Sequence, residues 1–303
     1  YLTNSHGIGA QFGYPISDIQ RLGLSFTYDK TDIDIGTSPA REIWDFVNAE
    51  GEIFETLTAQ ASWQRITLNR GTFPTDGAST ALSLSSTLPG SDINFFKLSV
   101  RQKYYQPLSE NFVFGFSGEI GYLSAFGDTE ETPFFQNFYA GGPRSLRGFE
   151  SNTLGPRSTE APCYEFNYSE GTCPNLIDTT GDGELDTPYF NPYANSNTRR
   201  NPIGGSIKVE GSLQLIFRLP FIEDQRSMRS AFFFDFGNVF SDNCKDYQIN
   251  CYKPSVDDLR YSYGVGVTWI TGFGPMSFAI TKPTNAGPFE ETEEFQFTVG
   301  NVF

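Results

Sequence analysis

Apolar residues recur at every second position along most of this chain. Such alternation places apolar side chains on one face of an extended strand and polar or small side chains on the other. Between Ile8 and Phe303 the pattern repeats in about eleven stretches of about 9–14 residues, and helical periodicity is nearly absent. The sequence therefore predicts an all-β protein built from about eleven antiparallel strands.

The charged residues within these stretches occupy the positions between the apolar ones, so they share one face of each strand. They are Lys97, Arg101, Glu119, Lys208, Glu210, Arg218, Asp235 and Arg260. A charge facing lipid near the middle of a membrane costs ~2–4 kcal/mol, so a bilayer would enforce this one-sided placement. The opposite face is aromatic and too extensive for one soluble core. The pattern favours a transmembrane antiparallel β-barrel with a polar lumen over the alternative, a soluble all-β protein.

Composition limits the functions open to such a chain. A formal net charge of -15 argues against a nucleic-acid partner, which would select for basic patches. The single histidine, His6, makes histidine-based zinc sites and Ser-His-Asp catalysis improbable, and no phosphate-binding glycine motif stands out. We expect neither enzymatic activity nor a cofactor.

The predicted connections alternate between short and long, as outer-membrane barrels require. The longest runs from Ser124 to Gly204, and we place it on the extracellular side. In an earlier long connection, Ser38-Pro39 and Gly51 would permit a short helix around Ala40–Ala49. A loop that covers the barrel mouth is the interpretation we favour for this segment.

Three stretches resemble one protein family. Arg144-Ser145-Leu146-Arg147-Gly148-Phe149, near the start of the longest loop, is similar to the Arg-Gly-Phe/Tyr motif on the sixth extracellular loop of the Omp85 superfamily. Asn69–Gly77 resembles a periplasmic turn of that family. The ending Phe295–Phe303 resembles its last strand, with the terminal aromatic residue of a β-signal. The resemblance runs over essentially the whole chain, residues 1–303.

The resemblance implies a location and a larger architecture. It implies that the chain lies in the outer membrane of Gram-negative bacteria. Assembly factors of this superfamily have a 16-stranded barrel preceded by POTRA domains, so this chain would correspond to the C-terminal strands, with the POTRA domains absent. An unclosed sheet would expose two backbone edges to hydrocarbon. We therefore expect a piece of a longer protein, or a sheet that closes in a non-native way, alone or with another chain.

The resemblance also implies roles for residues inside the barrel. The long loop would fold back into the lumen, where Arg147 of the motif Arg147, Gly148 and Phe149 would meet an acidic residue of the wall. Asp235 matches that acidic residue. At a second acidic position of the family this chain has Gln214, and Glu210 could substitute for it. The alternative is that Arg147 merely pins the loop.

For function, the resemblance implies folding and insertion of other β-barrel proteins through a seam between the first and last strands. Gly300, Asn301 and Phe303 are the candidate gate and β-signal residues. The partners would be outer-membrane protein clients, other subunits of a barrel assembly complex and the lipid bilayer. The alternatives are a polypeptide transporter, of the two-partner secretion or TamA-like kind, and a passive pore. Phe303 alone could be a routine β-signal.

Four cysteines form two local pairs, Cys163 with Cys173 and Cys244 with Cys251. Four cysteines permit three connectivities, and the local pairs close the shortest loops, so we favour two local disulfides.

Other acidic loop residues give weaker signals. Asp178, Asp182 and Asp186 have the spacing of a calcium loop, but no bidentate Glu follows, and a solvated acidic loop is favoured. Glu290-Glu291 is likewise interpreted as solvated charge.

Overall fold

The computed structural model describes residues 1–36, 39–160, 176–177, 181, 187–188, 201–219, 227–248, 251–272 and 274–300. Eleven strands form one antiparallel sheet in the order β1-β2-β3-β4-β5-β6-β9-β10-β11-β12-β13, and β7 and β8 form a separate pair. The strands are β1 (Leu2–Ser17), β2 (Gln20–Asp34), β3 (Ile53–Ile66), β4 (Gly77–Thr87), β5 (Phe95–Pro107), β6 (Phe112–Ala125), β7 (Leu176–Ile177), β8 (Thr187–Pro188), β9 (Ile207–Phe217), β10 (Met228–Phe240), β11 (Arg260–Thr271), β12 (Gly274–Thr284) and β13 (Phe295–Val299). The all-β fold and the strand number are confirmed.

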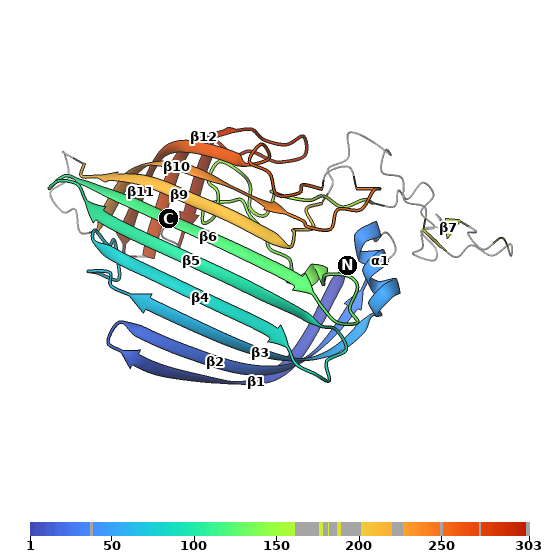
Figure 1. Cartoon of the computed structure of the whole chain (residues 1–303). Coiled ribbons are helices and arrows are strands. Elements are labelled where there is room, and N and C mark those ends of the chain that lie inside the picture. The colour runs from blue at the N-terminus through green and yellow to red at the C-terminus, as the bar shows by residue number, and fades with distance from the viewer. Residues whose placement is uncertain are drawn as a thin grey trace.

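The large sheet curls around a concave inner face (Figure 1). Each strand pairs with its neighbour in sequence, except that β6 pairs with β9 across the long loop, from Phe112↔Phe217 to Tyr122↔Ile207. Strands β1 and β13 are the two edges of this sheet and are not neighbours. The sheet of the described residues is therefore an open one.

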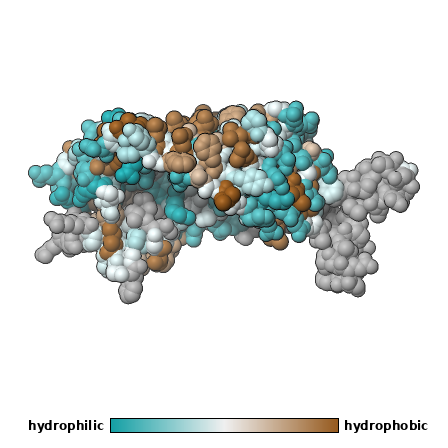
Figure 2. All heavy atoms as spheres, turned by 90° about the horizontal axis from the view of Figure 1, so that it is seen from below, coloured by the Kyte–Doolittle hydropathy of each residue, from teal (hydrophilic) through white to brown (hydrophobic). Residues whose placement is uncertain are grey.

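The two faces of the sheet have opposite chemistry, as the alternation predicts. Apolar side chains such as Phe12, Leu215 and Phe232 lie exposed on the convex face. On the face seen in Figure 2, hydrophobic side chains gather over the middle of the strands and hydrophilic ones lie toward both ends. Asp235 and Arg260 are buried on the opposite, concave face. This is the arrangement expected of strands with hydrocarbon on one side and a polar lumen on the other.

One helix, α1 (Arg41–Glu50), caps the end of the sheet at which the long loop leaves it (Figure 1). Our preference for a loop in this segment was wrong. Ile43, Phe46 and Val47 lie on one side of α1 and are buried, so the helix is stabilised by packing. Gly51 ends the helix as expected, with φ 100° and its N–H donated to the Val47 carbonyl. No helix in the described ranges is long and apolar enough to cross a membrane.

Two apolar clusters fix the loops against the sheet. The first joins α1 to the ends of β2, β3, β5 and β6 and to the short 3-10 helix Phe134–Gln136. The second joins the long loop to β10 through Ala140, Leu146, Phe149, Leu154 and Val239. The first part of the long loop, residues 126–160, thus lies against the concave face.

Candidate functional site

The guanidinium of Arg147 is buried against the sheet by a charge-assisted network. Its Nε and Nη2 donate to the two carboxylate oxygens of Asp235, each over 2.7 Å, and Nη2 also donates to Ser212 Oγ over 2.9 Å. The Arg147 backbone N–H donates to Asp235 Oδ2 over 3.2 Å. The guanidinium carbon lies 3.5 Å from the centre of the Phe233 ring. A bidentate pair of this kind fixes direction as well as distance.

The next motif residue, Gly148, is held between three strands. Its φ of +88° is in the left-handed region, and a Cβ there would lie 3.1 Å from Thr281 Oγ1 and 3.2 Å from Ser262 Cβ. Its N–H donates to Gln296 Oε1 over 3.2 Å, and Gln296 Nε2 donates to the Phe149 carbonyl over 2.9 Å. Because Gln296 belongs to β13, the motif is bonded directly to the last strand.

The loop also pairs with the segment that leads into β13. Glu293 N–H donates to the Gly148 carbonyl and Glu150 N–H to the Glu291 carbonyl, each over 2.9 Å. Phe149 forms an isolated antiparallel bridge with Thr292, and its ring is fully buried. The motif therefore contacts β10 through Arg147 and β13 through the residues that follow.

The two other wall residues named from the sequence contact this network differently. Glu210 accepts a hydrogen bond of 2.5 Å from Ser145 Oγ and forms an ion pair of 3.1 Å with Lys208. Gln214 Nε2 donates to Ser212 Oγ over 3.3 Å, and Ser212 is itself a partner of Arg147. Both therefore lie beside the motif.

The last strand is short where the gate is expected. Strand β13 pairs with β12 over five residues, from Met276↔Val299 to Ile280↔Phe295. Gly300 follows it with φ +83°, and its N–H donates to the Pro275 carbonyl over 2.7 Å. The left-handed backbone turns the chain out of the strand direction at this point. Asn301 and Phe303 lie outside the described residues.

The loop cysteines and acidic residues have mixed outcomes. Cys244 and Cys251 form a disulfide, as the local spacing predicts. Cys163, Cys173, Asp178, Asp182 and Asp186 lie outside the described residues. Within the described ranges, no group of three or more His, Cys, Asp or Glu could hold a metal ion.

The interpretation of Glu290 as solvated charge was wrong. Its carboxylate forms a buried ion pair of 2.6 Å with Arg260 and accepts the Gly287 N–H over 2.6 Å. The loop between β12 and β13 folds over the sheet and so removes this carboxylate from water.

The sequence reasoning missed Gln296, Ser212 and Phe233. All three face inward on strands that were correctly predicted, and Gln296 and Phe233 each lie between two outward-facing phenylalanines. Gln296 is a polar side chain at an inward position of an otherwise aromatic strand. That pattern could have indicated the contact between the loop and β13.

Comparisons with known proteins agree with this geometry. The model of the Omp85 superfamily domain matches residues 1–303. The chain is 26% identical to the outer membrane protein assembly factor BamA of Neisseria meningitidis, over 100% of this chain and 37% of that protein. The structure of BamA from Haemophilus ducreyi lacking POTRA domains 1-3 superposes with a TM-score of 0.73 and 27% identity, over 98% of this chain and 54% of that one.

A more distant solved structure shares only the fold. CdiB from Escherichia coli superposes with a TM-score of 0.50 at 10% identity, over 97% of this chain and 44% of that one. The matched family domain, the alternating faces and the motif loop inside the sheet agree with one another. This chain belongs to the Omp85 superfamily and is an outer-membrane β-barrel protein of bacteria.

Proposed function

We propose that this chain belongs to an outer-membrane assembly factor that folds and inserts β-barrel proteins without covalent chemistry. It would supply the last strand, which forms one side of the seam between the first and last strands. The observation that carries the proposal is strand β13, which is a sheet edge, pairs with β12 over five residues and is followed by the left-handed Gly300. A strand edge facing hydrocarbon has unpaired N–H and C=O groups that are costly to leave unpaired.

A client strand would supply those missing partners by β-augmentation, in which an extended segment joins an exposed sheet edge. The bend at Gly300 would keep the end of the chain away from the docking edge, and Asn301 and Phe303 would continue the gate. The clients would be outer-membrane proteins still lacking their own strand pairs.

The motif loop would hold this edge in position. Arg147 ties the loop to β10 and Gln296 ties it to β13, so the edge is braced from inside the lumen. In this proposal residues 124–204 face the outside of the cell. Upstream POTRA domains would contact the other subunits of an assembly complex.

The test is photo-crosslinking in cells that carry the full-length protein. A photoreactive residue at Val299, on β13, should crosslink to barrel clients during their assembly. The matched control is Phe232 on β10, which faces outward and is equally exposed, at 54% against 53% for Val299, but lies in an interior strand. Crosslinking at Val299 and not at Phe232 is the expected result.

Equal crosslinking at the two positions would refute docking at the edge. The rival function is polypeptide transport through the lumen, which requires the bound loop to leave the concave face. A passing polypeptide that crosslinks to a photoreactive residue at inward-facing Gln214, and not at Val299, would favour the transporter.

A further inference from the structure

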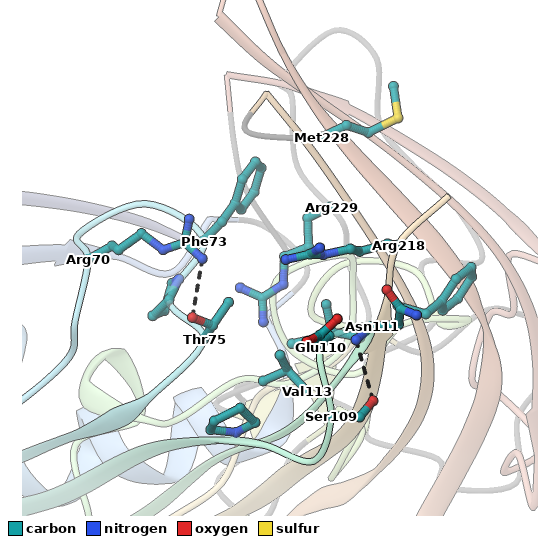
Figure 3. Close-up of a pocket in the computed structure, with 14 residues that line it drawn as sticks. Arg70, Phe73, Thr75, Ser109, Glu110, Asn111, Val113, Arg218, Met228 and Arg229 are labelled. Carbon is teal, nitrogen blue, oxygen red and sulfur yellow. Dashed lines mark hydrogen bonds between the residues drawn. The ribbon is translucent and has the colours of Figure 1, made fainter. Parts of the chain in front are cut away.

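A cavity of about 650 Å³ lies in the concave face at the end of the strands opposite the long loop (Figure 3). Its wall is made by the turn between β3 and β4, the turn between β5 and β6, and the adjacent ends of β9 and β10. Ligand sites in proteins commonly have volumes of about 300–1,000 Å³. The cavity is thus of a size that takes a ligand larger than a single ion.

Three arginines from three separate segments line this cavity: Arg70 in the β3–β4 turn, Arg218 just after β9, and Arg229 on β10. The only acidic residue in its lining is Glu110. Among the described residues, no ion pair joins Glu110 or any other carboxylate to these arginines. One guanidinium nitrogen of Arg229, Nη2, is buried without a hydrogen-bond partner there.

Three other cations on the concave face do form ion pairs with carboxylates. Arg147 and Arg260 form buried ion pairs of 2.7 and 2.6 Å, and Lys208 lies 3.2 Å from Glu119. The whole chain carries 36 Asp and Glu against 21 Lys and Arg, so carboxylates are not scarce. Within the described residues the three cavity arginines have no such ion pair: Arg229 is half-buried, and Arg70 and Arg218 are exposed.

The strand register brings two of the arginines to neighbouring strand ends. Ser230 pairs with Phe217, and Arg229 and Arg218 are the next residues on the two strands. Like charges that face each other across a sheet are destabilising, and an anion between them would relieve the repulsion. Guanidinium groups bind carboxylates and phosphates with two parallel hydrogen bonds.

The turn that carries Arg70 is held by hydrogen bonds within the turn. The Asn69 side-chain oxygen accepts the N–H groups of Thr75 and Asp76 over 3.1 and 3.3 Å. Phe73 is held at φ +49°, a backbone conformation that a bulky residue rarely adopts, with its side chain buried in the cavity wall. Strain retained at a lined cavity is a mark of pre-organised binding sites.

We propose that this cavity binds a carboxylate-bearing segment of a polypeptide that enters the lumen from the end opposite the long loop. Arg229 and Ile216 project from the inward face, away from the lipid, so a lipid headgroup does not reach them. The wall combines the arginines with the apolar side chains of Phe73 and Ile216, which suits an acidic peptide with apolar neighbours. The site is separate from β13, and the proposal does not depend on the seam.

The experiment measures binding of a fluorescent peptide of alternating Glu and Leu to the full-length protein in detergent, with a Gln-Leu peptide as the ligand control. Arg218→Gln and Arg229→Gln should each weaken binding of the Glu peptide by about tenfold or more, because each removes a charged hydrogen-bond donor. The matched variant is Arg21→Gln, which removes an exposed arginine at the same end of the sheet but outside the cavity. It should leave the affinity within about twofold, a difference too small for a lost charged hydrogen bond.

Three results would overturn the proposal. Equal binding of the Gln-Leu peptide would show that carboxylates are not recognised. An equal loss in Arg21→Gln would show only general charge attraction. Inorganic phosphate that displaces the peptide at an equal concentration would assign the cavity to a free anion. Arg218 is solvent-exposed, so its variant tests the cavity even if Arg229→Gln fails to fold.

Discussion

The two halves of the large sheet use the same alternating sequence but have different inner faces. Strand β1 is exposed along its whole length, and β2 is mostly exposed or half-buried. Strand β10 is buried at most of its inward positions because the long loop packs on it through Ala140, Leu146, Phe149 and Leu154. The comparison teaches that alternation determines which side chains face the lumen, whereas the loops determine whether those side chains remain in water.

The largest effect is expected when one ion-paired carboxylate is removed from each half of the sheet in turn. Asp235→Ala should lower the free energy of unfolding by ~3–5 kcal/mol, because it leaves the Arg147 charge buried without its main partner. Glu55→Ala breaks the Lys30–Glu55 pair, whose side chains are 41% and 46% exposed, and should have no measurable effect. Urea unfolding in detergent, followed by tryptophan fluorescence, measures both.

The double variant Arg147→Ala/Asp235→Ala sharpens the result. It leaves no lone charge, so its loss should be smaller than the sum of the two single losses. Equal losses for Asp235→Ala and Glu55→Ala would mean that the loop does not shield the covered half from water.

A second prediction separates hydrogen bonding from burial within the covered half. Gln296→Leu should cost ~1–3 kcal/mol, because the Gly148 N–H and the Phe149 carbonyl lose their buried partner. Thr298 is two residues further along the same strand, and its buried hydroxyl has no hydrogen-bond partner among the described residues. Thr298→Val should therefore be neutral or slightly stabilising in the same unfolding assay. A larger loss in Thr298→Val than in Gln296→Leu would contradict a hydrogen-bonded tie between the loop and β13.

The smallest effect on stability is expected at Glu42 of α1, which is contacted by the long loop. Burial raises the pKa of the Glu42 carboxyl, although the Thr159 N–H and the Gln248 amide donate to it. The ionised form therefore costs stability at neutral pH. That cost declines as pH falls through the raised folded-state pKa and vanishes below the ordinary value of 4.5.

Glu42→Gln should accordingly remove this pH dependence. Relative to the variant, the wild-type protein should gain stability as the pH is lowered from 7 toward 4.5. Unfolding curves of the two proteins at matched pH values measure the difference. A wild-type protein that loses stability relative to Glu42→Gln over this range would show that the hydrogen bonds outweigh the burial.

Most of the barrel wall could be predicted from the sequence, and α1 could not. The strands follow from a local rule, because one parity of each strand must be apolar and the other must carry the charges. Helix α1 is short, and its buried side chains Ile43 and Phe46 pack on residues distant in sequence, such as Phe134. Short helices are marginal without such packing, so the local signals for a helix were too weak to decide.

The candidate site divides in the same way. Arg147 and Asp235 were named because both match the pattern of the Omp85 superfamily, and Asp235 also lies at an inward position of its strand. Gln296 was missed, and Glu290 was misjudged, because nothing near either residue in the sequence indicates which loop will cover it.

The sequence by itself determined the strands, the direction in which each side chain points and the family, because a period of two is a property of a single extended segment. Only the tertiary structure decided which luminal charges are buried and paired, that three arginines gather at one cavity, and that the motif loop is bonded to the last strand. Those contacts join residues far apart in the chain, and their energies depend on how much water the folded loops exclude.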